Sequence, residues 1–143
     1  MEMIVNKVAE SGLVTLNLEQ FLPDENTYAG LDIAPFLFKG MILREKDFRA
    51  ALPEVDWSLY ENKQVAVFSS ADAIIPMWAY MLIAVYLQKC NATAHFCSLA
   101  QLKEKLMLSN IDSYNVEQHQ DGRVVVKGCG DVPLPESAFL KIS

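Results

Sequence analysis

The pattern of apolar and polar residues predicts a strand, a short elbow and a long helix between Lys63 and Gln88. Residues 64–68 are strand formers that do not alternate with polar residues, so both faces of this strand should be covered, as in a central parallel strand. A small polar segment at 69–72 follows, and Pro76 then opens a segment that is apolar nearly all round. That segment predicts a helix packed between layers or against a partner.

The rest of the chain predicts further strands and amphipathic helices in alternation. Strands are expected at 12–18, 92–97 and 123–128, and helices at 45–52 and after Ser98, which has capping-box spacing to Gln101. Residues 23–30 are expected to be a polar loop, and Asp32 should cap a short segment that ends at Gly40. This alternation is typical of an α/β fold, a three-layer doubly wound sheet that is mainly parallel.

The order of the core strands follows from their connections. The helix between strands 64–69 and 92–97 requires a right-handed crossover, which makes these strands neighbours. With strand 123–128 on the other side of the first, the core order is 2-1-3. At 143 residues the chain suits a single domain, 1–143, in which an N-terminal arm of one strand and short helices (1–58) precedes a βαβαβ core (59–143) whose last helix is cut short.

Two elbows of the chain resemble each other at a constant spacing along the sequence. The positions that match include Asp72 with Asp131, Pro76 with Pro135, and Ala79 with Ala138. The similarity indicates either an internal repeat or the stereochemistry that any β-loop-α unit shares. In both cases the elbows leave parallel strands at one edge of the sheet, and a 2-1-3 order places the ligand-binding switch point between them.

The charge and cysteine content exclude several classes of partner. The formal net charge is −6 and there is no basic run, which argues against nucleic acid and anionic membranes. The apolar stretch at 73–87 is shorter than the roughly 20 residues of a membrane span. The N-terminus lacks the pattern of a signal peptide. Three cysteines without CxxC spacing and two histidines make no metal site and favour free thiols in the cytoplasm.

Candidate functional residues gather at the elbows 69–76 and 128–136. Helix starts at Pro76 and Pro135 should direct free amides and positive dipole ends at the crevice, which suits a small anion. The ligand-binding candidates are Ser69, Ser70, Asp72, Cys129, Asp131, Glu136 and Ser137. Each has a structural alternative, because serines and aspartates often cap their own turns and a small residue such as Cys129 fits a tight turn.

Three functions are therefore consistent with the sequence. The first is a module that binds a small anionic ligand in the crevice. The second is a small enzyme that uses the thiol of Cys129, or Asp72 and Asp131 as paired carboxylates. The third is a structural or regulatory homo-oligomer, by default a homodimer, because a helix that is apolar nearly all round needs a covering surface. The sequence identifies no cofactor, substrate or reaction.

Three groups of residues also resemble a known family. They are Glu45-Lys46-Asp47-Phe48-Arg49, Ser70 to Pro76 with Trp78-Ala79-Tyr80, and Lys127-Gly128-Cys129 with Pro135-Glu136-Ser137-Ala138. These motifs are similar to those of a bacterial family filed as domain of unknown function 2480, over the whole chain. The resemblance implies a small cytoplasmic bacterial protein of unassigned activity. It also implies relatives that continue past the position of Ser143 with a helix and a cysteine-bearing tail.

Overall fold

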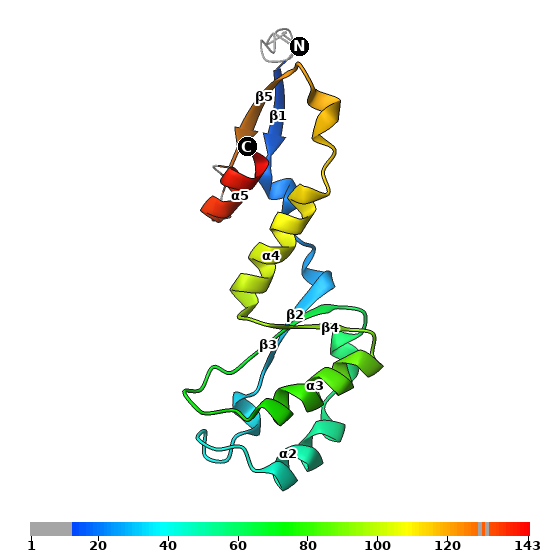
Figure 1. The fold of residues 1–143 in the computed structure, drawn as a ribbon, viewed down its shortest axis with the longest axis vertical. Helices are drawn as coiled ribbons and strands as arrows, with labels where there is room; N and C mark the ends of the chain where they lie inside the picture. The colour runs from blue at the N-terminus through cyan, green and yellow to red at the C-terminus, as the bar shows by residue number, and fades with distance from the viewer. Residues whose placement is uncertain (1–12, 129, 131) are drawn as a thin grey trace, which may run out of the picture. The chain divides into compact units, whose positions relative to one another are not determined.

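The computed structural model describes residues 13–128, 130 and 132–143, which form two compact units. Unit 1 contains residues up to Pro23 and from Glu104 onward, and unit 2 contains Asp24–Lys103. The strands and α-helices, labelled in Figure 1, are β1 (Leu13–Asn17), β2 (Tyr28–Asp32), α2 (Glu45–Ala51), β3 (Gln64–Phe68), α3 (Met77–Lys89), β4 (Thr93–Phe96), α4 (Leu99–Asp112), β5 (Arg123–Lys127) and α5 (Glu136–Ile142). Short 3-10 turns connect several of them.

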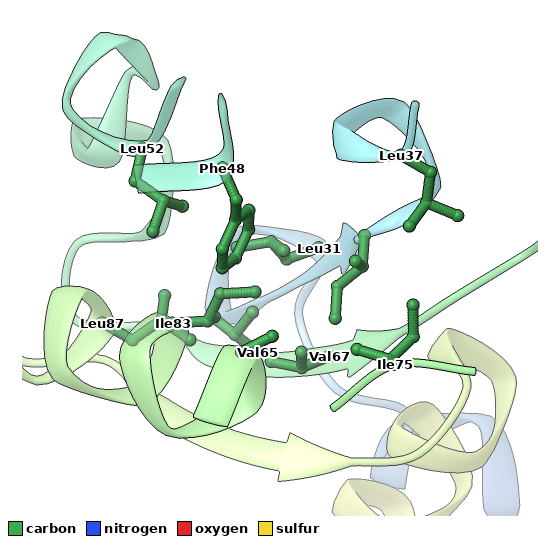
Figure 2. Close-up of a cluster of buried hydrophobic side chains, with 11 residues drawn as sticks. Leu31, Leu37, Phe48, Leu52, Val65, Val67, Ile75, Ile83 and Leu87 are labelled. Carbon is green, nitrogen blue, oxygen red and sulfur yellow. The ribbon is translucent and has the colours of Figure 1, made fainter. Parts of the chain in front are cut away.

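Unit 2 is built on a three-stranded parallel sheet in the order β2-β3-β4. Two helices cover the same face of this sheet, because side chains of both pack against the inward valines of β3. Figure 2 shows Phe48 of α2, Leu52 directly after that helix, and Ile83 and Leu87 of α3 converging on Val65 in one buried cluster. The unalternating strand and the apolar helix that follows it are therefore explained by one core.

The opposite face of the same sheet is covered in part by the start of α4. Ala66 points away from the valine face and is buried. A Cβ placed on Gly30 would lie 3.2 Å from the ring of Phe68 and 3.5 Å from a methyl of Leu99, so the glycine allows a close approach. Unit 2 thus has helices on both faces of its sheet.

Unit 1 contains a two-stranded parallel sheet, β1-β5, with α5 and the larger part of α4. Its buried cluster is Leu18, Phe21, Met107, Ile111 and Ala138. The side chain of Asn110 donates a 2.9 Å hydrogen bond to the carbonyl of Phe21, which ties α4 to the turn after β1.

The structure confirms the α/β class, the parallel strands and the positions of the expected helices, but it corrects the strand order. β5 does not flank β3, as a 2-1-3 core order required, because it pairs with β1 in a separate sheet. The place next to β3 belongs to β2, part of which was expected to be a polar loop. The single-domain organisation stays a prediction.

Candidate functional site

The carboxyl ends of β2, β3 and β4 meet at one edge of the unit 2 sheet, because the three strands are parallel. This is the edge at which open α/β sheets bind ligands. The chain leaves it through Asp32, the elbow that begins at Ser69, and the pair Cys97-Ser98. The segments that follow the three strands therefore border the candidate site.

A hollow of about 490 Å³ lies at this edge. Its walls combine three aromatic rings with small and polar side chains, and none of the lining residues is acidic or basic. The lining residues are Phe68, Ser69, Ala71, Ala73, Tyr80, Phe96, Cys97, Ser98 and Gln101. The rings of Tyr80 and Phe96 pack edge to face with centroids 5.2 Å apart, which fixes one wall.

Asp32 holds the elbow in place across the edge. Its Oδ1 accepts hydrogen bonds from the amides of Ala34 and Ser70, both at 2.9 Å, and its Oδ2 accepts from the Ser70 hydroxyl at 2.6 Å. Burial alone would raise the pKa of this carboxyl, but the hydrogen bonds from Ser70 and Ala34 outweigh it and hold the pKa below its ordinary value. The Ser70 hydroxyl thus has a structural partner, which sequence reasoning did not identify.

Ser69 is also used within the elbow. Its hydroxyl donates to the carbonyl of Ala71 at 3.1 Å and accepts from the amide of Ala71 at 3.3 Å. This local turn keeps Ser69 half-buried at the rim of the hollow. Of the serine candidates, Ser69 lines the hollow and can still offer an oxygen lone pair to a ligand.

The amino end of α4 borders the hollow through a capping box. The Ser98 hydroxyl accepts from the Gln101 amide at 3.1 Å, and the Gln101 side-chain oxygen accepts from the Ser98 amide at 2.9 Å. This confirms the expected Ser98–Gln101 spacing. The box satisfies two of the amides at the helix start, while the positive end of the α4 dipole remains at the rim.

Cys97 is a free thiol, half-buried in the lining of the hollow. Sequence reasoning missed it, although the argument that singled out Cys129, a thiol directly after a strand and before a helix start, applies equally here. The residues that line the hollow beside Cys97 include no lysine, arginine or histidine.

The other candidates from the sequence have separate environments. Asp72 is exposed and Glu136 is exposed at the start of α5, while the Ser137 hydroxyl donates to Glu104. Cys129 and Asp131 lie outside the described residues. The elbow 69–76 belongs to unit 2 and 128–136 to unit 1, so the strand order that was expected to join them in one crevice is wrong.

Within residues 13–128, 130 and 132–143, no group of three or more His, Cys, Asp or Glu could hold a metal ion. In the same part of the chain, no helix has both the length and the apolar character to cross a membrane. The described site thus offers hydrogen-bonding groups, one thiol and aromatic surface for recognition.

Comparisons with known proteins give a family without an activity. Residues 2–143 match the family model described as "Protein of unknown function (DUF2480)". Neither the comparison with curated proteins nor the comparison with solved structures found a match.

Proposed function

The chain belongs to the DUF2480 family, whose function is not assigned, and we propose that it binds a small anionic ligand with an apolar body at the carboxyl edge of the unit 2 sheet. The observation that carries the proposal is the hollow at this edge. Three parallel strands end there, and the positive end of α4 borders it. The elbow 69–76 forms one wall of this site, and Cys97 and Ser98 lie where a second elbow was expected.

The lining suggests how such a ligand would be held. The rings of Phe68, Tyr80 and Phe96 offer flat apolar surface, which suits a planar or aliphatic body. The anionic group would lie against the start of α4, where the helix dipole favours negative charge and the lining contains no carboxylate to repel it. The Ser69 and Gln101 side chains would fix its orientation.

Three small probes test this assignment by thermal unfolding of the full chain. Benzoate carries a ring and a charge, benzamide the same ring without the charge, and inorganic phosphate the charge without the ring. We expect benzoate to raise Tm the most, because it alone carries both the ring and the charge. A ligand that binds only the folded state stabilises it by about 2.7 kcal/mol at a hundred times its Kd. Equal shifts for benzoate and benzamide would show that the charge is not recognised.

A matched pair of variants locates the binding site. Ala73→Phe places a ring in the hollow and should abolish the benzoate shift. Ala50→Phe adds the same ring at an exposed position on α2 and should leave it unchanged. Circular dichroism of both variants checks that they fold. A benzoate shift that survives in Ala73→Phe would place the ligand elsewhere.

The free thiol of Cys97 supports one alternative, an enzyme that uses it as a nucleophile. Such a thiol normally needs a neighbouring base or cation to favour the thiolate, and the residues that line the hollow beside Cys97 include no lysine, arginine or histidine. We therefore expect Cys97 to react with iodoacetamide at the rate of an ordinary thiol. A rate increased by orders of magnitude near neutral pH would favour the enzyme over the binding module.

The compartment that fits these side chains is the bacterial cytoplasm. Cys90 and Cys97 are both free thiols and are half-buried rather than sealed, a state that a reducing compartment maintains. Alkylation of thiols in intact cells, followed by mass spectrometry, should find both cysteines reduced. Recovery of either cysteine in a disulfide would contradict this assignment.

A further inference from the structure

The outer side of α3 and the neighbouring strand β4 form an apolar groove of about 420 Å³. Met77 and Met81 of α3 are 76% and 68% exposed, and Phe96 of β4 is 80% exposed. Ala84 and Ala94 lie between them and leave the groove open. Large apolar side chains that gather at one place on a surface usually mark an interface.

Among the residues that the structure describes, no strand pairs with the β4 edge of the sheet beside this groove. The amide of Thr93 donates to the carbonyl of Lys63, so the backbone groups of Thr93 point toward β3. Because backbone directions alternate along a strand, the N–H and C=O groups of Ala94 and Phe96 point away from the sheet. Native edges are usually protected by lysine, proline or a bulge, and the Thr93–Phe96 segment has no lysine or proline.

We propose that a second copy of this chain covers the groove and the edge together. The two β4 strands would pair antiparallel about a twofold axis normal to the sheet. The product is a continuous six-stranded sheet, with both α3 helices side by side on one face. This surface shares the rings of Tyr80 and Phe96 with the ligand hollow, and it adds methionines and outward backbone groups that can form hydrogen bonds.

Symmetry restricts the register of this pairing. An axis normal to the sheet keeps each face on the same side, so residues that pair directly must both point to the same face. The register that uses every outward backbone group places His95 opposite His95 of the second copy and Ala94 opposite Phe96. Four hydrogen bonds then form, two for each Ala94–Phe96 pair.

The same register matches side-chain sizes on the helix face. Ala94 and Phe96 point to the face that α3 covers, because Ala94 is in register with Val65 and Phe96 with Val67. Each Phe96 ring would therefore lie over the Ala94 of the other copy. It would occupy the space that the small side chains of Ala84 and Ala94 leave open in that copy's groove. A large residue opposite a small one makes this surface complementary to itself, as a twofold interface requires.

Charge favours a second copy over other occupants. The groove is lined by no lysine, arginine, aspartate or glutamate. A charged peptide, an anionic membrane or a nucleic acid would find no complementary charged group in this groove. A second copy presents the same groove, so the contact brings together no lysine, arginine, aspartate or glutamate side chains of the groove.

The oligomeric state tests the surface. Sedimentation velocity of the full chain at micromolar concentration should show a dimer, and Met81→Glu should shift it to a monomer because a carboxylate would be buried without a partner. Met41→Glu is the matched control, since Met41 is similarly exposed in unit 2 but lies outside the groove. A wild-type monomer, or a dimer that Met81→Glu leaves intact, would overturn the proposal.

Crosslinking tests the register. In a Cys90→Ser, Cys97→Ser, Cys129→Ser background, His95→Cys would place two cysteines on the axis, about 4.5 Å apart between Cα atoms, within the range of a disulfide. Mild oxidation should then give a covalent dimer. Thr93→Cys in the same background is the control, because its two copies lie far from the axis. A dimer in which His95→Cys does not crosslink, or Thr93→Cys does so equally well, would overturn the edge pairing.

Discussion

The two units contain the same local structure, a strand followed by an elbow and a helix. The matching residues are separated by the same number of positions in the sequence, the constant spacing that relates the two elbows. β2 pairs with β3 from Tyr28 with Gln64 onward, and β1 pairs with β5 over a stretch of equal length, from Leu13 with Arg123 onward. The elbows then end alike: Pro76 and Pro135 precede their helices with φ and ψ of −64° and 148°, and −72° and 144°. Ala79 and Ala138 are both fully buried, and each amide donates to the carbonyl of the proline that precedes its helix.

Equivalent residues nevertheless differ in burial. Val65 and Val67 of β3 are 0% and 5% exposed, whereas Val124 and Val126 of β5 are 37% and 38% exposed. β3 has a strand on each side, with two helices packed on its valine face, while β5 has a paired strand on one side among the described residues and is followed by a short helix, α5. The layers around a strand, and not its own residues, therefore decide whether its valines are core.

The elbows differ in a second way that concerns the ligand site. Ser69 and Tyr80 of unit 2 both line the hollow. Their counterparts at the same spacing are Gly128 and Phe139, and a Cβ on Gly128 would collide with the Phe139 ring. The Phe139 ring thus occupies the space beside Gly128 in unit 1, whereas Tyr80 and Ser69 border an unfilled hollow in unit 2. This difference explains why the hollow belongs to unit 2.

The largest expected effect comes from charging equivalent valines. Val65→Asp buries a carboxylate in the core cluster without a partner, which costs several kcal/mol and should abolish the cooperative unfolding of unit 2. Val124→Asp places the same group at an exposed position and should leave a folded protein. Circular dichroism with urea unfolding measures both. Similar losses for the two variants would show that Val124 is covered in solution.

Truncation of equivalent isoleucines should show the same contrast on a smaller scale. Ile83→Ala removes a fully buried side chain of α3 and should cost about 2–5 kcal/mol. Ile142→Ala, its counterpart in α5, removes a half-buried side chain and should cost clearly less. Denaturant midpoints at a fixed m-value give both numbers. An Ile142→Ala cost equal to that of Ile83→Ala would contradict the comparison.

The glycine of the unit 1 elbow gives the next effect. Gly128→Ser should cost about 1–3 kcal/mol, because its Cβ would force the Phe139 ring to move. Gly128→Ser combined with Phe139→Ala should recover part of the loss, since the collision is then removed. Thermal unfolding of the two variants and of Phe139→Ala alone completes the cycle. Additive losses would show that the ring is not the cause.

The smallest effect is the pH dependence contributed by Asp32. Since its pKa is lower in the folded chain, the ionised carboxylate stabilises the fold above its ordinary pKa of about 3.8, and this contribution is lost as the pH falls through the lower, folded value. Asp32→Asn should therefore flatten the fall in Tm below about pH 4. The corresponding position in unit 1 is Asn17, whose side chain accepts from the Glu19 amide, and Asn17→Ala should not change the slope. An unchanged slope in Asp32→Asn would contradict the assignment.

Local patterns predicted the α-helices, the strands β1, β3, β4 and β5, and the Ser98–Gln101 capping box, because such features depend mainly on nearby residues. They could not predict which strands pair, since the valines of β5 suit β1 and β3 equally well. β2 was not predicted, because Gly30 suggests a loop. Glycine is suited to this strand position because Phe68 and Leu99, which are distant in sequence, approach it closely. The hollow was missed because its lining combines the elbow after β3, Tyr80 of α3, the end of β4 and the start of α4, and local patterns do not show that these side chains surround one space.

The pairing of β1 with β5 has a consequence for the order in which the protein assembles. Leu13 pairs with Arg123, so most of the chain lies between these partners, whereas Gln64 pairs with both Tyr28 and Thr93 across much shorter connections. Loop-closure entropy makes the longer connection costlier by about 1 kcal/mol and slower to form. On the ribosome, the β2-β3-β4 sheet can form while β5 is still being synthesised. β1 is thus the first of these strands to be made and the last to find its partner.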